Sequence, residues 1–168
     1  FVGGAEHEDT RYFDGFDRFN RGVTSFWGEA ILTPVDRLAI TGGVRHDDDD
    51  AFGGHTTFGA NAAYTFPTET TLRGSYAEGF KAPTLFQLYA PFLGDPTLKP
   101  EAAKSWDAGI EQRLVDGKLV LSATWFQRRT RNQIDFDLGT FTYGNIARTK
   151  ASGLEFGIEM RPTNRLTF

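Results

Sequence analysis

Apolar and polar residues alternate with a period of two along nearly the whole of this 168-residue chain. Successive side chains of a β-strand point to opposite faces of a sheet, so the pattern predicts strands with one apolar face. Clear examples are Leu38–His46, His55–Phe66 and Trp106–Leu114. We count about eight such strands, with the start of another at Leu166–Phe168. Many run for about ten residues, longer than the ~5–6 typical of soluble sheets and close to the ~9–11 that cross a bilayer.

The connections between these strands differ in length. Short turns are expected at Pro34–Arg37, Pro67–Glu69, Val115–Lys118 and Pro162–Arg165, and Asp116-Gly117 is a hairpin signal. Longer polar links are expected between them, at Asp47–Gly54, Gly79–Ala103 and Asp135–Asn145. Outer-membrane barrels have this asymmetry, with tight periplasmic turns at one rim and long extracellular loops at the other. A soluble β-sandwich also alternates apolar and polar residues, but strand length and loop asymmetry favour a membrane barrel.

Composition agrees with strands and excludes several classes of protein. The chain has 16 Phe, 5 Tyr, 3 Trp and 19 Gly but no Cys, which excludes disulfides and thiolate metal sites. A net charge of -4 gives no reason to expect nucleic acid as a partner. No apolar run approaches the ~20 residues of a membrane helix. The mean hydropathy of -0.38 is compatible with a barrel, whose strands alternate lipid-facing and lumen-facing residues.

Charged residues occupy the polar phase of the alternation, which in a large barrel faces the water-accessible interior. We expect them to pack in the lumen, against one another or a plug, rather than to contact ligand directly. This set comprises Arg45, Arg73, Glu111, Arg113, Arg128 and Glu155.

Three stretches carry a family resemblance. Residues 74–89 (GSYAEGFKAPTLFQLY), followed by residues 94–101 (GDPTLKPE), resemble the mid-barrel signature of TonB-dependent receptors, with Asp95 where Asn is commoner. Residues 44–53 (VRHDDDDAFG) resemble the preceding hairpin of cobalamin-receptor-like members. Residues 143–155 (YGNIARTKASGLE) resemble a later strand of the family. Together these matches lie within residues 44–155, about two thirds of the chain, in the order in which the family has them.

The resemblance implies an all-β fold, the wall of an antiparallel transmembrane β-barrel in the outer membrane of a Gram-negative bacterium. Members of the family have a barrel of 22 strands and an N-terminal plug that contacts TonB. Residues 1–168 would then supply about eight to nine strands of a single barrel domain. No part of the chain resembles the plug, so the expected contact with TonB lies in a part of the receptor N-terminal to it.

The resemblance also implies active import of a scarce small-molecule nutrient complex. A cobalamin-like corrinoid is favoured, because Asp47–Gly53 and Phe80–Pro83 look most like that branch, and a ferric siderophore is the next candidate. A passive porin-type barrel and a soluble β-rich binding module remain as alternatives. No nucleophile–base pair, HExxH motif or nucleotide-binding glycine loop is present, so no enzyme is expected.

The loop Gly79–Ala103 is the expected ligand-contacting segment, since exposed aromatic residues on long loops often bind ligands. The candidate residues, which a purely architectural loop would also explain, are Phe80, Lys81, Phe86, Tyr89 and Phe92.

The acidic run Asp47, Asp48, Asp49 and Asp50 is a weak candidate for Ca²⁺, which prefers oxygen ligands. Its spacing matches no known calcium loop, and a solvated loop tip is the simpler interpretation. His46 and His55 flank the same loop, but a role at the rim is favoured over a metal site. No cofactor is expected.

Overall fold

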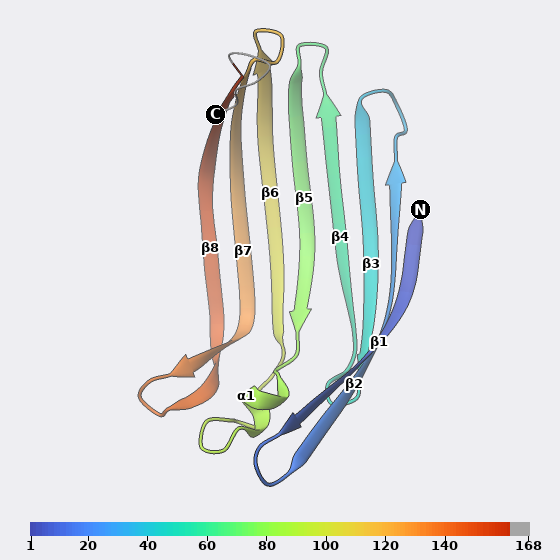
Figure 1. Ribbon diagram of the computed structural model, residues 1–168. Helices are drawn as coiled ribbons and strands as arrows, with labels where there is room; N and C mark the ends of the chain where they lie inside the picture. Colours follow the sequence, from blue (N-terminus) through green and yellow to red (C-terminus); the bar gives the residue numbers. More distant parts are fainter. Residues whose placement is uncertain (162–168) are drawn as a thin grey trace.

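The computed structural model describes residues 1–161, which form one antiparallel sheet of eight strands in chain order and one short helix (Figure 1). The strands are β1 (Val2–Phe13), β2 (Arg18–Leu32), β3 (Leu38–Asp49), β4 (Gly53–Thr65), β5 (Thr70–Lys81), β6 (Glu101–Leu114), β7 (Leu119–Asp137) and β8 (Thr142–Met160). The helix α1 (Leu85–Tyr89) lies between β5 and β6. The predicted count of about eight strands is confirmed, whereas the expected turn Pro162–Arg165 and strand Leu166–Phe168 lie outside the described residues.

The register of the strands divides the sheet into an apolar and a polar face. One row of cross-strand partners from β5 to β8 contains Leu72, Ile110, Ala123 and Phe156, and the next contains Arg73, Gly109, Thr124 and Glu155. Because side chains alternate along each strand, these rows lie on opposite faces. All six charged residues expected in the lumen share the polar face, which confirms the predicted phase.

The apolar face has no covering layer among residues 1–161. Leu154, Phe156 and Ile158 are exposed, Phe156 to 77% of its surface. The buried apolar residues lie instead in α1, in the links beside it and in the part of β7 near its loop: Leu85, Leu88, Ala90, Leu98 and Ile134. An exposed apolar face of this kind is what a strand wall presents to lipid in a membrane barrel.

The short turns at one end of the sheet have the predicted positions. Residues 33–37, 66–69 and 115–118 connect β2 to β3, β4 to β5 and β6 to β7. In the last of these, Val115, Asp116 and Gly117 all have positive φ, of 54°, 54° and 80°. A tight hairpin needs this left-handed backbone, which Asp and Gly adopt at low cost.

Two of the three long links predicted at the other end, drawn at the bottom of Figure 1, are short turns. Strand β3 runs to Asp49 and β4 begins at Gly53, and β7 runs to Asp137 and β8 begins at Thr142. The predicted long links Asp47–Gly54 and Asp135–Asn145 are therefore wrong, and residues 82–100 form the one long connection among residues 1–161. Both faces of a strand become polar beyond the membrane, so these strand ends resemble loops in composition.

The part of the chain that the structure describes contains one helix, of five residues. Among residues 1–161 no helix has the length and hydrophobicity needed to cross a membrane.

Candidate ligand-binding site

Helix α1 is fixed at both its ends and along its buried side. The Gln87 backbone N–H donates to the Thr84 side-chain oxygen (3.1 Å), and the Thr84 N–H donates to the Gln87 side chain (2.9 Å). This reciprocal capping box satisfies two N–H groups that have no partner within the helix. Leu85 and Leu88 are buried beneath the helix. The short helix is therefore a rigid platform within the long link.

The rest of the link is tied to the β7–β8 hairpin. Leu88, Leu98 and Ile134 form a small core that packs against half-buried aromatic side chains. Asn145 accepts a hydrogen bond from the Lys99 N–H (2.8 Å) and donates through its amide to the carbonyl oxygens of Lys99 (3.0 Å) and Asn132 (2.7 Å). Residues 82–100 are thus a folded part of the barrel mouth.

Six aromatic residues from five elements meet at this end of the sheet. Phe19 stacks on Tyr89 with ring centroids 4.1 Å apart, and Phe86 contacts Tyr12 at 5.8 Å and Tyr143 at 6.1 Å in edge-to-face geometry. The Tyr143 ring also contacts the ring of Phe136 in β7, with centroids 5.2 Å apart. Tyr12 and Phe19 have the parity of the polar face. We call the set the mouth cluster: Tyr12, Phe19, Phe86, Tyr89, Phe136 and Tyr143.

Three connections each present an exposed phenylalanine near the mouth cluster. Phe16, Phe92 and Phe141 are exposed to 86%, 97% and 62%. Phe92 and Phe141 also have positive φ, of 67° and 57°, a conformation that costs a bulky side chain of order 1–3 kcal/mol. Exposure of the ring together with backbone strain is unfavourable for Phe92 and Phe141 unless these rings contact a molecule or segment outside the described residues.

The structure brings together some of the residues that the sequence singled out. Phe86 and Tyr89 belong to the mouth cluster, and Phe92 lies at the tip of the long link. Phe80 and Lys81 lie in β5, so the predicted start of the loop at Gly79 is wrong by about three residues. The Phe80 ring stacks on His55 at 4.0 Å and is not part of the cluster.

The sequence analysis missed the other four members of the mouth cluster. Tyr12, Phe19, Phe136 and Tyr143 lie within two residues of a connection, at the ends of β1, β2, β7 and β8. An aromatic residue at both ends of each of two hairpins was the available signal. The predicted ligand-contacting segment was confined to the long link and so did not include these hairpins.

Lys81 lines a polar hollow on the inner face. This hollow has a volume of about 560 Å³ and also includes Glu101, Arg128, Thr130 and Thr149. The Lys81 ammonium pairs with Glu101 at 3.0 Å, whereas Arg128 forms no ion pair among residues 1–161. The hollow therefore suits a group with negative charge.

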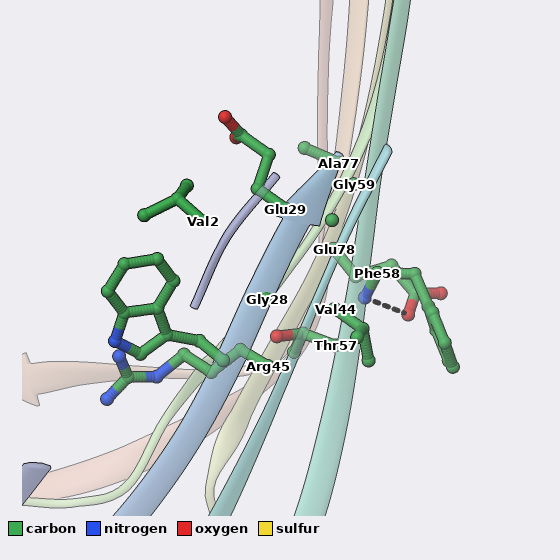
Figure 2. A pocket seen from close by; sticks show the side chains of 12 residues that line it. Val2, Gly28, Glu29, Val44, Arg45, Thr57, Phe58, Gly59, Ala77 and Glu78 are labelled. Carbon is green, nitrogen blue, oxygen red and sulfur yellow. Dashed lines mark hydrogen bonds between the residues drawn. The ribbon is translucent and has the colours of Figure 1, made fainter. Parts of the chain in front are cut away.

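A second hollow of about 290 Å³ lies over β2, β3 and β4 (Figure 2). Figure 2 shows Arg45 and Phe58 extending to opposite sides of the sheet, as their register requires. The Arg45 guanidinium donates to Asp47 (2.7 Å), Ser25 (2.8 Å) and a third partner, Glu6 (2.5 Å). Arg45 is therefore held within the wall, in agreement with the packing role expected for it.

The acidic run does not converge on a common point. Asp47 accepts from Arg45 and Ser25, Asp49 from the backbone N–H groups of Ala51 and Phe52, and Asp50 from the N–H of Gly22. Asp48 and Asp49 alternate in parity, so their carboxylates point to opposite faces. Within residues 1–161 no group of three or more His, Cys, Asp or Glu residues is arranged to hold a metal ion.

His46 and His55 do not approach each other either. His46 is hydrogen-bonded to Thr56 (2.8 Å), while His55 packs on Phe80.

One carboxylate of the run anchors the wall beneath the mouth. Asp49 is only 3% exposed, and its Oδ2 lies 3.6 Å from Nε of Arg21. The Arg21 guanidinium also donates to the carbonyl oxygen of Pro83 (2.5 Å). Asp49 and Arg21 thereby join β3, β2 and the beginning of the long link.

Asp14 shapes the tip of the β1–β2 hairpin. Its Oδ1 accepts hydrogen bonds from the N–H groups of Asp17 (2.7 Å) and Phe16 (2.8 Å). These two bonds, that of Asp17 foremost, hold the pKa of the Asp14 carboxyl below its ordinary value of 3.8. The carboxylate form of Asp14 therefore supports the turn that presents Phe16.

A curved antiparallel sheet with one apolar face, tight turns at one end and aromatic residues at the other has the architecture of a membrane β-barrel wall. Residues 3–168 match the family described as TonB dependent receptor-like, beta-barrel. The chain belongs to this family. The family assignment places it outside the soluble β-sandwich and porin classes that the sequence left open.

Comparison with individual proteins agrees with this assignment. The chain is 31% identical over 165 residues to the vitamin B12 transporter BtuB of Vibrio cholerae serotype O1, covering 95% of this chain and 26% of that protein. It therefore spans about a quarter of the length of the curated relatives it matches. These relatives are named as transporters, not enzymes.

Solved structures share the fold. The siderophore receptor PirA from Pseudomonas aeruginosa superposes with a TM-score of 0.86 at 23% identity, over 98% of this chain and 34% of that chain. The ferric enterobactin receptor PfeA of the same species gives 0.75 at 21% identity, over 89% of this chain and 26% of that chain.

Proposed function

We propose that this chain forms part of the wall of an outer-membrane receptor that captures a scarce nutrient complex and imports it with energy supplied through TonB. The observation that carries the proposal is the mouth cluster, in which three segments far apart in sequence bring six aromatic rings to the loop end of the wall. Aromatic side chains supply large contact areas with few rotatable bonds, and such anchors dominate many binding sites. The contact with TonB is proposed to lie in a plug N-terminal to this chain.

A cobalamin-like corrinoid is the favoured ligand. Its flat, bulky ring system suits a surface of aromatic faces and edges, and the chain is similar to a vitamin B12 transporter over 95% of its length. A ferric siderophore is the second candidate, favoured by the polar hollow. An anionic iron complex there would pair with Arg128, which has no carboxylate partner among residues 1–161, and would compete with Glu101 for Lys81.

Equilibrium titration of the complete receptor in detergent tests the proposal, with cyanocobalamin and ferric enterobactin as separate probes. If the mouth cluster binds the corrinoid, Phe86→Ala should weaken cyanocobalamin binding about tenfold, equivalent to ~1.4 kcal/mol. The control Val115→Ala, an exposed side chain at the opposite end of the wall, should leave the affinity unchanged.

Two results would change the proposal. Enterobactin binding that is lost in Lys81→Gln/Arg128→Gln but kept in Phe86→Ala would move the site to the polar hollow. Binding of neither probe, or binding that is indifferent to both variants, would contradict ligand capture by this part of the wall.

A further inference from the structure

The apolar face of β5 to β8 changes abruptly from uncharged to cationic side chains along the strands. Over the rows from Leu72 to Tyr76 this face carries no charged residue on any of the four strands. Tyr76 and Trp106 end the band, with ring centroids 5.6 Å apart, as an aromatic girdle does at the membrane interface. The rows immediately beyond carry five cations on the same face. We call them the basic patch: Lys104, Arg129, Arg131, Arg148 and Lys150.

The register sets these cations directly against one another. Arg129 lies opposite Lys104 on one side and Lys150 on the other, and Arg131 lies opposite Arg148. Like charges at directly opposed positions destabilise a sheet. The arrangement therefore has an energetic cost that the chain's own packing does not offset.

Carboxylates of the described chain neutralise only one member of the basic patch. Lys104 pairs with Glu78 at 2.8 Å on the neighbouring strand. Within residues 1–161, Arg129, Arg131, Arg148 and Lys150 form no ion pair, and all four are exposed. Four positive charges thus lie together on the outer surface of the wall.

The basic patch lies at the depth of lipid head groups. The Arg129 guanidinium carbon lies 5.7 Å from the centre of the Trp106 ring, which marks the edge of the apolar band. Cross-strand Cα atoms are ~5 Å apart and alternate residues of a strand ~7 Å apart. Four cations on such a grid match the size and charge of one or two phosphate groups.

The feature is local rather than a general property of this rim. On β1 to β4, the first polar side chains beyond the apolar band of the same face include His7, Thr24, His46 and Thr56. None of these is Lys or Arg. Arg11 and Arg18 share this face but lie two and three rows further from the apolar band than His7. The cations beside the band are therefore concentrated on β6, β7 and β8.

We infer that the basic patch is a binding site for a membrane lipid with a phosphate-bearing head group, in the leaflet on the loop side of the wall. The acyl chains would lie along Trp125, Leu154 and the other apolar residues of β7 and β8, and the phosphates would accept hydrogen bonds from the guanidinium groups. Bound phosphate would remove the repulsion between the opposed cations. The inference holds whichever nutrient enters the mouth.

A titration of the complete receptor in phosphate-free detergent tests the site, with diphosphoryl lipid A as the probe and its dephosphorylated form as the comparison. The double variant Arg129→Gln/Arg131→Gln should bind lipid A about thirtyfold more weakly, since each cation near an anionic head group contributes about fivefold. The control Arg73→Gln/Arg113→Gln removes two cations of the polar face and should not change the affinity. Equal binding by wild type and the Arg129/Arg131 variant, or equal affinity for dephosphorylated lipid, would overturn the site. Competition by millimolar inorganic phosphate as effective as that by lipid A would show a free-anion site and overturn the lipid as ligand.

Thermal unfolding gives a second readout that a loss of folding cannot imitate. Without lipid A, the Arg129/Arg131 variant should melt at a higher temperature than wild type, because the three opposed like-charge pairs that these arginines form are gone. With lipid A the order should reverse, since only wild type gains from the bound phosphates. A variant that melts below wild type without lipid would mean that carboxylates already neutralise these arginines, and would contradict the inference.

Discussion

The rings of Phe19 and Tyr89 lie face to face, with centroids 4.1 Å apart and 4° between their planes. Phe19 is the second residue of β2, and Tyr89 is the last residue of α1. This stack joins the first hairpin of the wall to a link 70 positions later in the chain. It therefore holds the two halves of the mouth cluster in one arrangement.

Removal of the stack should loosen the mouth without harm to the rest of the wall. In Tyr89→Ala the ring contact, worth about 0.5–1.5 kcal/mol, is lost, and residues 82–100 should be cleaved faster by protease. Tyr89→Phe keeps the ring and should behave like wild type. Limited proteolysis of the inserted receptor, with mass spectrometry of the fragments, measures both. Equal cleavage of wild type and Tyr89→Ala would show that the stack contributes nothing to the order of the link.

Asp49 and Asp48 provide a matched pair for the role of the acidic run. Asp49→Ala leaves the guanidinium of Arg21 without its buried partner, and loss of one member of such a pair costs about 3 kcal/mol or more. Asp48→Ala removes an exposed carboxylate and should cost less than about 0.5 kcal/mol. Denaturant unfolding of the complete receptor, with and without added Ca²⁺, compares them. A protective effect of Ca²⁺ that Asp48→Ala abolishes would revive the calcium site.

Substitutions of Phe92 should show whether its strained backbone conformation serves ligand binding. In Phe92→Gly the positive φ costs nothing, so the link should gain up to about 1 kcal/mol of stability. If the ring contacts ligand, affinity should fall about tenfold in the same variant. Phe92→Leu, which keeps the strain but loses the aromatic ring, separates the two effects. A more stable link with unchanged affinity would remove Phe92 from the candidate site.

Ile158 and Glu155 test the assignment of the two faces. They have opposite parity on β8, with Ile158 beside Leu121 and Glu155 beside Thr124. Ile158→Arg should cost about 2–4 kcal/mol if the side chain lies near the bilayer midplane, and Glu155→Gln should be mild. Reversible refolding into lipid vesicles gives both values. Similar costs for the two changes would argue against the lipid-facing phase.

The β1–β2 tip should depend on pH through Asp14. Because its folded pKa lies below 3.8, its contribution to the turn is present above the unfolded value and is lost as the pH falls through the folded value. Carboxyl ¹³C NMR should give a midpoint below 3.8 for Asp14. Hydrogen exchange of the Phe16 and Asp17 amides should accelerate in Asp14→Ala. A midpoint at or above 3.8 would show that the two backbone hydrogen bonds do not form in solution.

The alternation of side chains predicted which residues face outward and which face inward, because every membrane-spanning strand places apolar side chains toward lipid. The phase of Arg73 against Leu72, or of Glu155 against Phe156, followed from period two alone and agrees with the register. The same rule failed at the strand ends. Beyond the bilayer both faces of β7 meet water, so Asp135 and Asp137 read as loop although the ladder continues through them.

The candidate site was predictable only where it is local. Phe86, Tyr89 and Phe92 stand out within one segment, whereas Tyr12, Phe19 and Tyr143 join them through contacts that no sequence spacing encodes. The basic patch was likewise invisible before the register was known, since Arg129 and Lys150 become neighbours only when β7 pairs with β8.

The β7–β8 hairpin, with strands of 19 residues each, also separates two electrostatic environments. From Gln127, at the edge of the apolar band, to Asp137 the strand covers roughly 30 Å at ~3.3 Å per residue. Charges in salt solution are screened over ~8 Å at physiological ionic strength. Negative head groups of the bilayer therefore have little influence at the tip of this hairpin. A solute that arrives there meets a field set by the protein alone, so the charge of the bilayer does not repel an anionic nutrient at the tip.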